Sequence, residues 1–146
     1  MTIQDFQGEA GARSEGRDLH AANIWIPQIV RYAALVNDEE RLRRAWIERD
    51  LSAAAVTDYD ELYGRIFDDL DADNLEPEMT RLLDPTRAGT IRRFLAALRS
   101  GDRVIESDVI YLDMQTLLAS NVWRAVRQAA RDVVAAFGAR PWTGQN

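Results

Sequence analysis

The side chains of this chain that could do chemistry are mainly carboxylates, and they are concentrated in one short segment. Nine of them fall within residues 58–78, where the only cation is Arg65, so these 21 residues have a formal charge of −8. The whole chain of 146 residues has a formal charge of −6, and everything outside the segment therefore sums to +2. A concentrated negative field attracts cations and basic proteins and repels nucleic acids and anionic lipids. The members of this acidic segment are Asp58, Asp60, Glu61, Asp68, Asp69, Asp71, Asp73, Glu76 and Glu78.

Part of the acidic segment resembles the start of a calcium-binding loop. Residues 69–73 read Asp-Leu-Asp-Ala-Asp, which is how an EF-hand loop begins. The rest of the loop does not follow. Asn74 stands where the sharp turn needs glycine, and Thr80 stands where a bidentate glutamate must close the loop. Calcium binding of the EF-hand type is therefore not predicted.

A second use of the carboxylates is a magnesium-dependent phosphohydrolase. Helical enzymes of that kind hold the metal with carboxylates spaced i,i+3 or i,i+4 that project from at least two helices. The acidic segment supplies two such pairs, Asp58 with Glu61 and Asp68 with Asp71, and Glu39–Glu40 lies in another helical stretch. No complete set of ExxE and ExxD motifs is present, so this enzyme is the alternative hypothesis for function.

The composition excludes most other routes to catalysis. There is no cysteine and no lysine, since all 18 residues of the Lys+Arg count are arginines, and His20 is the only histidine. Thiol nucleophiles, Schiff-base lysines and histidine-rich zinc sites are excluded as a result. We predict that the chain is not an enzyme and that it uses no cofactor and no resident metal.

A folded acidic surface is suited to covering the basic cleft of another protein. Its carboxylates occupy positions at which phosphates would bind, and they accelerate association over long range. Small, acidic, cysteine-free domains of this sort include bacterial immunity proteins and antitoxins, which neutralise a cognate toxin. The similarity is one of size and charge alone. It predicts a protein-binding module, most specifically an immunity- or antitoxin-type inhibitor whose partner is a basic protein such as a toxin.

The predicted partner-binding residues come from the middle of the acidic segment. We expect them on the exposed side of a helix and in the loop after it, while the apolar residues of the same helix face the core. Gly64 supports this expectation, because a glycine on an exposed helix face costs stability and permits close approach of another chain. The predicted contacts are Glu61, Arg65, Asp68, Asp69, Asp71 and Asp73, with Tyr59 and Phe67 supporting them from the core.

Internal neutralisation is the structural alternative to a binding face. Asp68, Asp69 and Asp71 lie toward the C-terminal end of their helix, where the helix dipole disfavours negative charge. They need a compensating partner, which is a metal, another protein or arginine. A protein of pI about 4.8 without lysine is a poor nucleic-acid binder, so we expect the arginine stripe of the last helix to pair with the acidic helix instead. That stripe consists of Arg124, Arg127 and Arg131.

A third hypothesis for function is a structural or self-assembling module. Large exposed apolar side chains favour association, because association removes them from water. Four tryptophans provide such a surplus of apolar surface, namely Trp25, Trp46, Trp123 and Trp142.

The periodicity of the apolar residues is helical nearly throughout and predicts an all-α fold. We expect one compact, irregular bundle of six or seven helices at 18–138, a flexible leader at 1–17 and a C-terminal tail at 139–146. The residues at 103–112 are rich in β-branched side chains and allow a strand, but nothing pairs with it, so we interpret them as helical. The expected helices are 18–36, 38–51, 59–70, 77–83, 85–100, 103–112 and 113–137.

Helix boundaries are marked by a few residues. Pro27 interrupts the first helix, Asn37 or Asp38 caps the second, and Asp84–Pro85 begins a longer one that Gly101 should close. Gly138 should end the last helix. Thr57 followed by Asp60 resembles a capping box at the start of the acidic helix.

The chain shows no signal of export or membrane insertion. The first residues have no apolar h-region, and no uncharged apolar run is long enough to cross a bilayer. We therefore expect a soluble cytoplasmic protein with no membrane partner.

Overall fold

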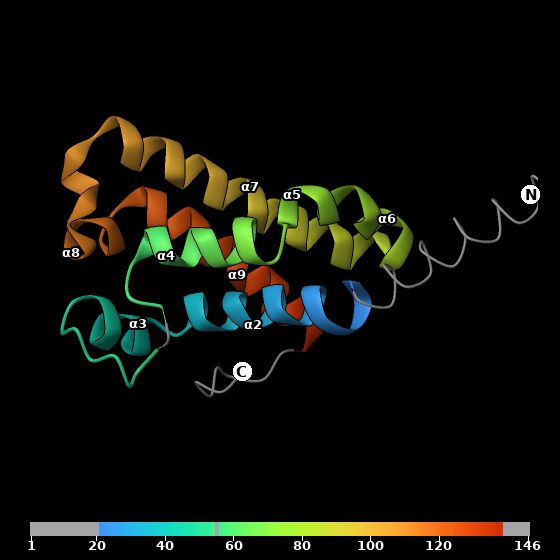
Figure 1. Ribbon diagram of the computed structural model, residues 1–146, viewed down its shortest axis with the longest axis horizontal. Coiled ribbons are helices and arrows are strands. Elements are labelled where there is room, and N and C mark those ends of the chain that lie inside the picture. Colours follow the sequence, from blue (N-terminus) through green and yellow to red (C-terminus); the bar gives the residue numbers. More distant parts are fainter. Residues whose placement is uncertain (1–20, 55, 139–146) are drawn as a thin grey trace, which may run out of the picture.

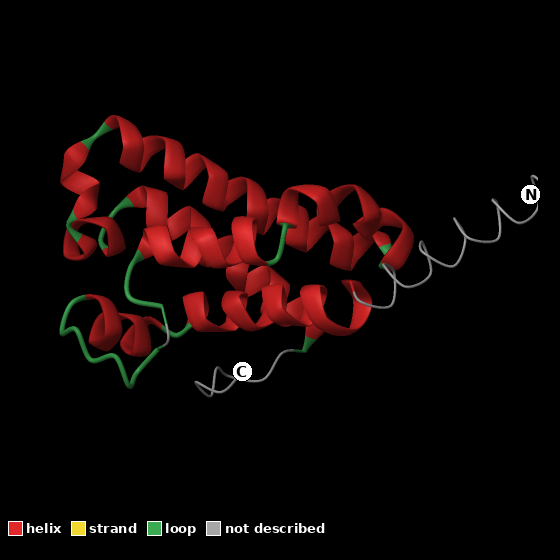
Figure 2. Ribbon diagram, viewed as in Figure 1, coloured by secondary structure: helices red, strands yellow, loops and turns green. Residues whose placement is uncertain are grey.

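The computed structural model describes residues 21–54 and 56–138, and within them it consists of helices and loops only (Figure 2). The predicted all-α fold, a compact bundle in one domain, is confirmed. The leader predicted at 1–17 and the tail predicted at 139–146 lie outside the described residues.

Seven helical units follow one another along the described residues if contiguous segments are joined and η4 is grouped with α8. Segments η1 and η2 are π-helical, and η3 and η4 are 3-10 helices. The bounds are η1 (Ala21–Trp25), α2 (Ile26–Asn37), α3 (Glu39–Trp46), α4 (Tyr59–Gly64), η2 (Arg65–Asp69), α5 (Ala72–Leu75), η3 (Glu76–Glu78), α6 (Met79–Leu82), α7 (Pro85–Ser107), η4 (Val109–Leu112), α8 (Met114–Leu118) and α9 (Asn121–Phe137).

Helix α9 is the centre of the bundle and packs against both α7 and α2 (Figure 1). Its buried residues recur every three or four positions and give it one continuous apolar face. At one end of this face, the Trp123 ring lies 5.3 Å from the Trp46 ring and 6.2 Å from the Tyr59 ring, measured between centroids. This aromatic cluster joins α9 to α3 and α4.

Most of the predicted helix ends are confirmed. The Asp38 side chain caps α3 by accepting from the backbone N–H of Arg41, and the Asp84 side chain caps α7 with Pro85 as its first residue. Helix α2 begins next to Pro27, as a proline in the first turn predicts. Gly138 ends α9 in the left-handed conformation, at φ 59°.

The predicted end of the long helix at Gly101 is wrong. Helix α7 continues through Gly101 to Ser107, so the interpretation of 103–112 as helical is confirmed by the end of α7 and by η4. Gly101 is buried and serves packing, since the Tyr59 hydroxyl lies directly over it. The absent side chain makes room for α4.

Two other predicted helices are shorter in the structure. The helix expected at 113–137 is divided, because the Ser120 side chain accepts from the backbone N–H of Trp123 and starts α9 anew. The helix expected to reach Leu51 ends at Trp46. Arg49 then adopts the left-handed conformation at φ 61°, which a regular helix does not accommodate.

Two of the tryptophans expected to drive self-association are core residues. Trp46 and Trp123 are buried, and the Trp46 indole donates to the backbone oxygen of Val56 at 3.0 Å. Trp25 is half-buried, and Trp142 lies outside the described residues. Within the part of the chain that the structure describes, no helix is long and apolar enough to cross a membrane.

Candidate functional site

The acidic helix consists of α4 and η2. Two carboxylates at its N-terminus, those of Asp58 and Glu61, accept hydrogen bonds there. The Asp58 side chain caps α4 by accepting from the backbone N–H of Glu61 at 2.8 Å. The Thr57 hydroxyl and backbone N–H both donate to Glu61 Oε2, at 2.6 and 3.2 Å. These hydrogen bonds lower the pKa of Glu61, and the bond from the Thr57 hydroxyl has the largest effect. The capping box predicted from Thr57 and Asp60 is therefore wrong by one residue. Asp58 caps the helix, and the side chain of Glu61 accepts from Thr57.

On the side of the acidic helix that faces α2, the charges neutralise one another. Arg65 lies 3.4 Å from Glu61 and 3.6 Å from Asp69, so the three side chains form a ladder along α4 and η2. Burial raises the pKa of Tyr32 of α2, and the charges of Arg65 and Asp69 also act on its phenol. Three of the six predicted contact residues thus belong to one internal ion-pair ladder.

The segment after η2 is held by its own hydrogen bonds and by α7. Asp71 adopts the left-handed conformation at φ 53° and accepts from the Asn74 side chain, at 2.9 Å on each oxygen. Arg99 of α7 pairs with Asp73 at 2.6 Å and with Glu76 at 3.1 Å. The Arg99 guanidinium also lies 5.0 Å from the centre of the Phe67 ring. Arg99 therefore supplies the ion pairs that join this part of the acidic segment to α7, beside the buried side chains of Ala72 and Leu75.

Asp60 and Asp68 differ from their neighbours, because neither takes part in an ion pair or side-chain hydrogen bond with any described residue. Both are exposed. Each lies four residues from Gly64, which places Asp60, Gly64 and Asp68 on one line along the helix. A Cβ atom on Gly64 would lie 3.7 Å from Asp68 Oδ2, at ordinary contact distance. This line runs along the outer surface of α4 and η2.

Helix α7 adds two carboxylates beside this line. The Tyr59 hydroxyl donates to the backbone oxygen of Leu98 at 2.5 Å and so holds α4 close to α7. Burial, followed by the charges of Glu106 and Asp60, raises the pKa of Asp102. Carboxylates that are distant in sequence therefore act on one another in the fold.

Asp102 and Glu106 also act on the phenol of Tyr63 in α4. Burial raises the pKa of the Tyr63 phenol, and the nearby charges of Asp102 and Asp73 raise it further. The Tyr63 ring stacks on the Phe67 ring, with centroids 4.3 Å apart. We define the acidic face as the four carboxylates of α4, η2 and α7 that make no ion pair with a described residue, namely Asp60, Asp68, Asp102 and Glu106.

The candidate site therefore differs in part from the one predicted. Ion pairs with Arg65, Arg81 or Arg99 hold at least five of the nine carboxylates of the acidic segment. Of the six predicted contact residues, Glu61, Arg65 and Asp69 lie together in the ion-pair ladder. Asp73 pairs with Arg99 of α7, and Asp71 accepts from Asn74 in the loop. Asp68 lies on the outer surface without an ion pair to a described residue. Tyr59 and Phe67 are buried, as expected of core support.

Sequence reasoning missed Asp102 and Glu106, which follow the acidic segment by more than twenty residues. Their i,i+4 spacing places them on one side of α7, and Gly101 beside them marks the place where another helix approaches closely. A glycine followed by spaced carboxylates was the available signal.

The arginine stripe of α9 does not pair with the acidic helix, so that expectation is wrong. Arg127 lies 3.5 Å from Glu39 of α3, and its Nε is buried without a hydrogen-bond partner. Arg124 and Arg131 are exposed and form no ion pair with any residue that the structure describes. Arginines of η2, α6 and α7 pair with the carboxylates of the acidic segment instead.

Neither a metal cluster nor a known relative adds to this picture. In residues 21–54 and 56–138, no three Asp, Glu or His side chains gather in a way that could hold a metal ion. Comparison with protein-family models, with curated proteins and with solved structures gives no match. The geometry of the acidic face therefore carries the functional argument.

Proposed function

We propose that this chain is a protein-binding module, most specifically an immunity- or antitoxin-type inhibitor that covers the basic surface of a cognate toxin. The binding surface is the acidic face, flanked by the predicted contacts Asp69, Asp71 and Asp73. Such an inhibitor acts in the cytoplasm of the cell that makes the toxin, where it meets its partner before any damage is done.

One observation carries this proposal. Asp60, Asp68, Asp102 and Glu106 come from two packed helical units, yet no described arginine pairs with any of them. Nearby arginines such as Arg65 and Arg99 are already engaged with other carboxylates. Negative charge that the fold gathers and does not neutralise is available to a cationic partner.

The electrostatics of Asp102 support the same proposal. The carboxylates of Glu106 and Asp60 oppose its ionisation, so in the free protein the like charges repel one another. Arginine or lysine side chains of a partner would turn this repulsion into attraction on binding. Gly64, which is half-buried between Asp60 and Asp68, carries no side chain that would keep a partner away from the helix backbone.

Capture from cells that produce the chain tests the proposal with two matched variants. The face variant carries Asp60→Asn, Asp68→Asn and Glu106→Gln. The control variant carries Glu40→Gln, Glu48→Gln and Asp132→Asn. Each variant removes three negative charges from a chain of formal net charge −6. The two variants therefore have the same net charge and differ in the positions of the removed carboxylates.

We expect the wild type and the control variant to retain a basic protein that the face variant loses. The wild type should also inhibit the activity of the retained protein when the two are mixed as purified components. Equal retention by all three chains, or retention of no basic protein, would refute the proposal, because the acidic face would then have no specific role.

A further inference from the structure

Exposed apolar side chains are concentrated at the end of the bundle opposite η1. Four of the five large hydrophobic residues that the described chain leaves exposed belong to η4 or to the loop after α3, and the fifth is Ile24 in η1. The exposed fractions are 63% for Leu51, 75% for Val109, 54% for Ile110 and 65% for Leu112. Single exposed hydrophobic residues are common, but a cluster of them marks an interaction surface. Figure 1 shows the loop after α3 and the segment before α8 at this same end.

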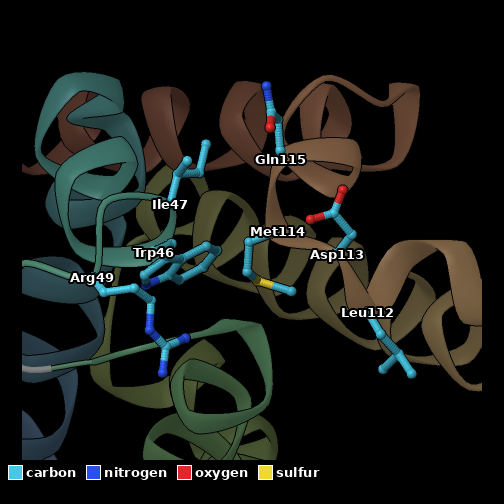
Figure 3. A pocket seen from close by; sticks show the side chains of 7 residues that line it. All are labelled: Trp46, Ile47, Arg49, Leu112, Asp113, Met114 and Gln115. Carbon is cyan, nitrogen blue, oxygen red and sulfur yellow. The ribbon is translucent and has the colours of Figure 1, made fainter.

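A pocket of about 310 Å³ lies between these two segments. Figure 3 shows the Trp46 indole and the Met114 side chain at its centre, with Arg49 and Asp113 on opposite sides of them. The α3 side contributes Trp46, Ile47 and Arg49, and the other side contributes the four residues from Leu112 to Gln115. We call this pocket, together with the exposed residues Leu51, Val109 and Ile110, the end patch.

The two sides of the end patch have opposite charges at the pocket. Arg49 is exposed and forms no ion pair with a described residue, and its backbone is in the left-handed conformation. Asp113 caps α8, with Oδ2 accepting from the backbone N–H and the hydroxyl of Thr116, which leaves Oδ1 free. The two side chains line the same pocket without pairing with each other.

We propose that the end patch binds a second copy of this chain in a two-fold symmetric dimer. In such an interface the same surface serves both partners, so a residue i that contacts j is matched by j contacting i. A cation on one side of the pocket and a carboxylate on the other meet this requirement. A two-fold axis through the pocket places Arg49 of each copy against Asp113 of the other and covers both sets of η4 side chains.

The charge pattern around the pocket favours a second copy over a uniformly basic or acidic partner. The exposed side of α3 and the turn after it carry Glu40 and Glu48 as well as Arg43 and Arg44, so the charge there is mixed. A strongly cationic partner would meet arginine there, and a strongly anionic one would meet Asp113. The end patch shares no residue with the acidic face, although Val109 follows Glu106 by only three positions, and the proposal does not depend on the proposed inhibitor function.

Sedimentation velocity of the full chain, from about 5 µM to about 500 µM, tests this proposal. We expect a reversible monomer–dimer equilibrium for the wild type. Leu112→Asp should weaken the dimer at least about tenfold, because it places a desolvated charge at the centre of each half of the interface. Arg49→Asp should weaken it as well, and aspartate tolerates the left-handed backbone at this position. Ile24→Asp is the matched control, since it introduces the same charge at an exposed apolar residue outside the end patch.

Each result supports the proposal or overturns it. Dissociation by Leu112→Asp and Arg49→Asp, with Ile24→Asp unchanged and all thermal melts cooperative, supports the two-fold dimer. A wild type that stays monomeric at about 500 µM overturns it and leaves the end patch to a different protein. A dimer that Leu112→Asp does not weaken overturns it too, because the contact then lies elsewhere.

Discussion

The hydroxyl of Tyr59 occupies the space that a side chain on Gly101 would need. A Cβ atom built on Gly101 would lie 2.5 Å from the Tyr59 oxygen and 3.2 Å from the adjoining ring carbon. Tyr59 belongs to α4 and Gly101 to α7, so this contact sets how closely the two helices approach. The next residues along the two helices are Asp60 and Asp102, and the same close approach makes their carboxylates neighbours.

Gly101→Ala should separate the two helices. The added methyl group cannot fit beside the buried Tyr59 ring, and overpacking of this kind costs about 1–3 kcal/mol of unfolding free energy. Urea denaturation followed by circular dichroism measures this loss. The matched control is Gly89→Ala in the same helix, where the new Cβ would lie 3.4 Å from the movable end of the Arg93 side chain. That change should stabilise the protein by about 0.5–1 kcal/mol. A stable Gly101→Ala variant would show that the contact does not position α4.

The pKa of Asp102 predicts how stability depends on pH. Burial and the charges of Glu106 and Asp60 raise it above the ordinary 3.8, so the folded chain holds this proton more tightly than the unfolded chain does. The ionised carboxylate therefore destabilises the fold at neutral pH, and the loss is relieved as the pH falls through the raised pKa. Asp102→Asn should increase the melting temperature at pH 7, and the increase should vanish near about pH 3.

Thermal melts of the wild type and the variant across this pH range check the prediction. Asp60→Asn serves as a second arm. It removes part of the same repulsion, so the double variant Asp60→Asn with Asp102→Asn should gain less than the sum of the two single gains. A variant less stable than the wild type at pH 7 would mean that Asp102 is paired rather than repelled.

Much of the fold follows from local signals. Asp38, Asp84 and Ser120 each place a hydrogen-bond acceptor at the start of a helix, and Gly138 places a left-handed residue at the end of one. Asp84 and Gly138 were predicted, and Asp38 was one of two predicted caps beside Asn37, because capping depends on only a few neighbouring residues. The role of Gly101 depends on Tyr59, 42 positions earlier in the sequence, so the local rule that glycine ends a helix gave the wrong answer.

The candidate site was harder to predict, because charges neutralise one another across the fold. Spacing along one helix indicates that Arg65 can reach Glu61 and Asp69. No spacing rule indicates that Arg99 of α7 reaches Asp73, or that Arg127 of α9 turns to Glu39. Which carboxylates remain free is a property of helix packing, and sequence periodicity does not encode it directly.

Asp68 and Asp69 are adjacent carboxylates in different surroundings, and this difference makes a test. Asp69 lies 3.6 Å from Arg65, whereas Asp68 has no ion-pair partner among the described residues. An arginine of the partner can bind Asp68 without breaking an internal pair. Asp68→Asn should therefore accelerate dissociation of the complex by about tenfold or more, and Asp69→Asn should do so less. Surface plasmon resonance with the captured partner compares the two, and a larger effect at Asp69 would contradict the assignment of Asp68 to the face.

The metal-dependent alternative makes a different prediction. A preformed metal site stabilises the folded state, because the ion binds the native chain more tightly than the unfolded one. The described residues form no cluster of three carboxylate or histidine donors, so about 10 mM Mg²⁺ or Mn²⁺ should leave the melting temperature unchanged. Differential scanning fluorimetry with and without the ion measures this. A rise of several degrees would favour the phosphohydrolase hypothesis.

The most direct test of the central claim is the association rate with the captured basic partner at ionic strengths from about 50 to about 500 mM. Salt screens the attraction between charged surfaces, so the rate for the wild type should fall steeply over this range. The control variant with Glu40→Gln, Glu48→Gln and Asp132→Asn should follow the wild type. The face variant with Asp60→Asn, Asp68→Asn and Glu106→Gln should bind more slowly and with a flatter dependence on salt. Identical salt curves for the two variants would contradict the claim that the acidic face is the binding surface.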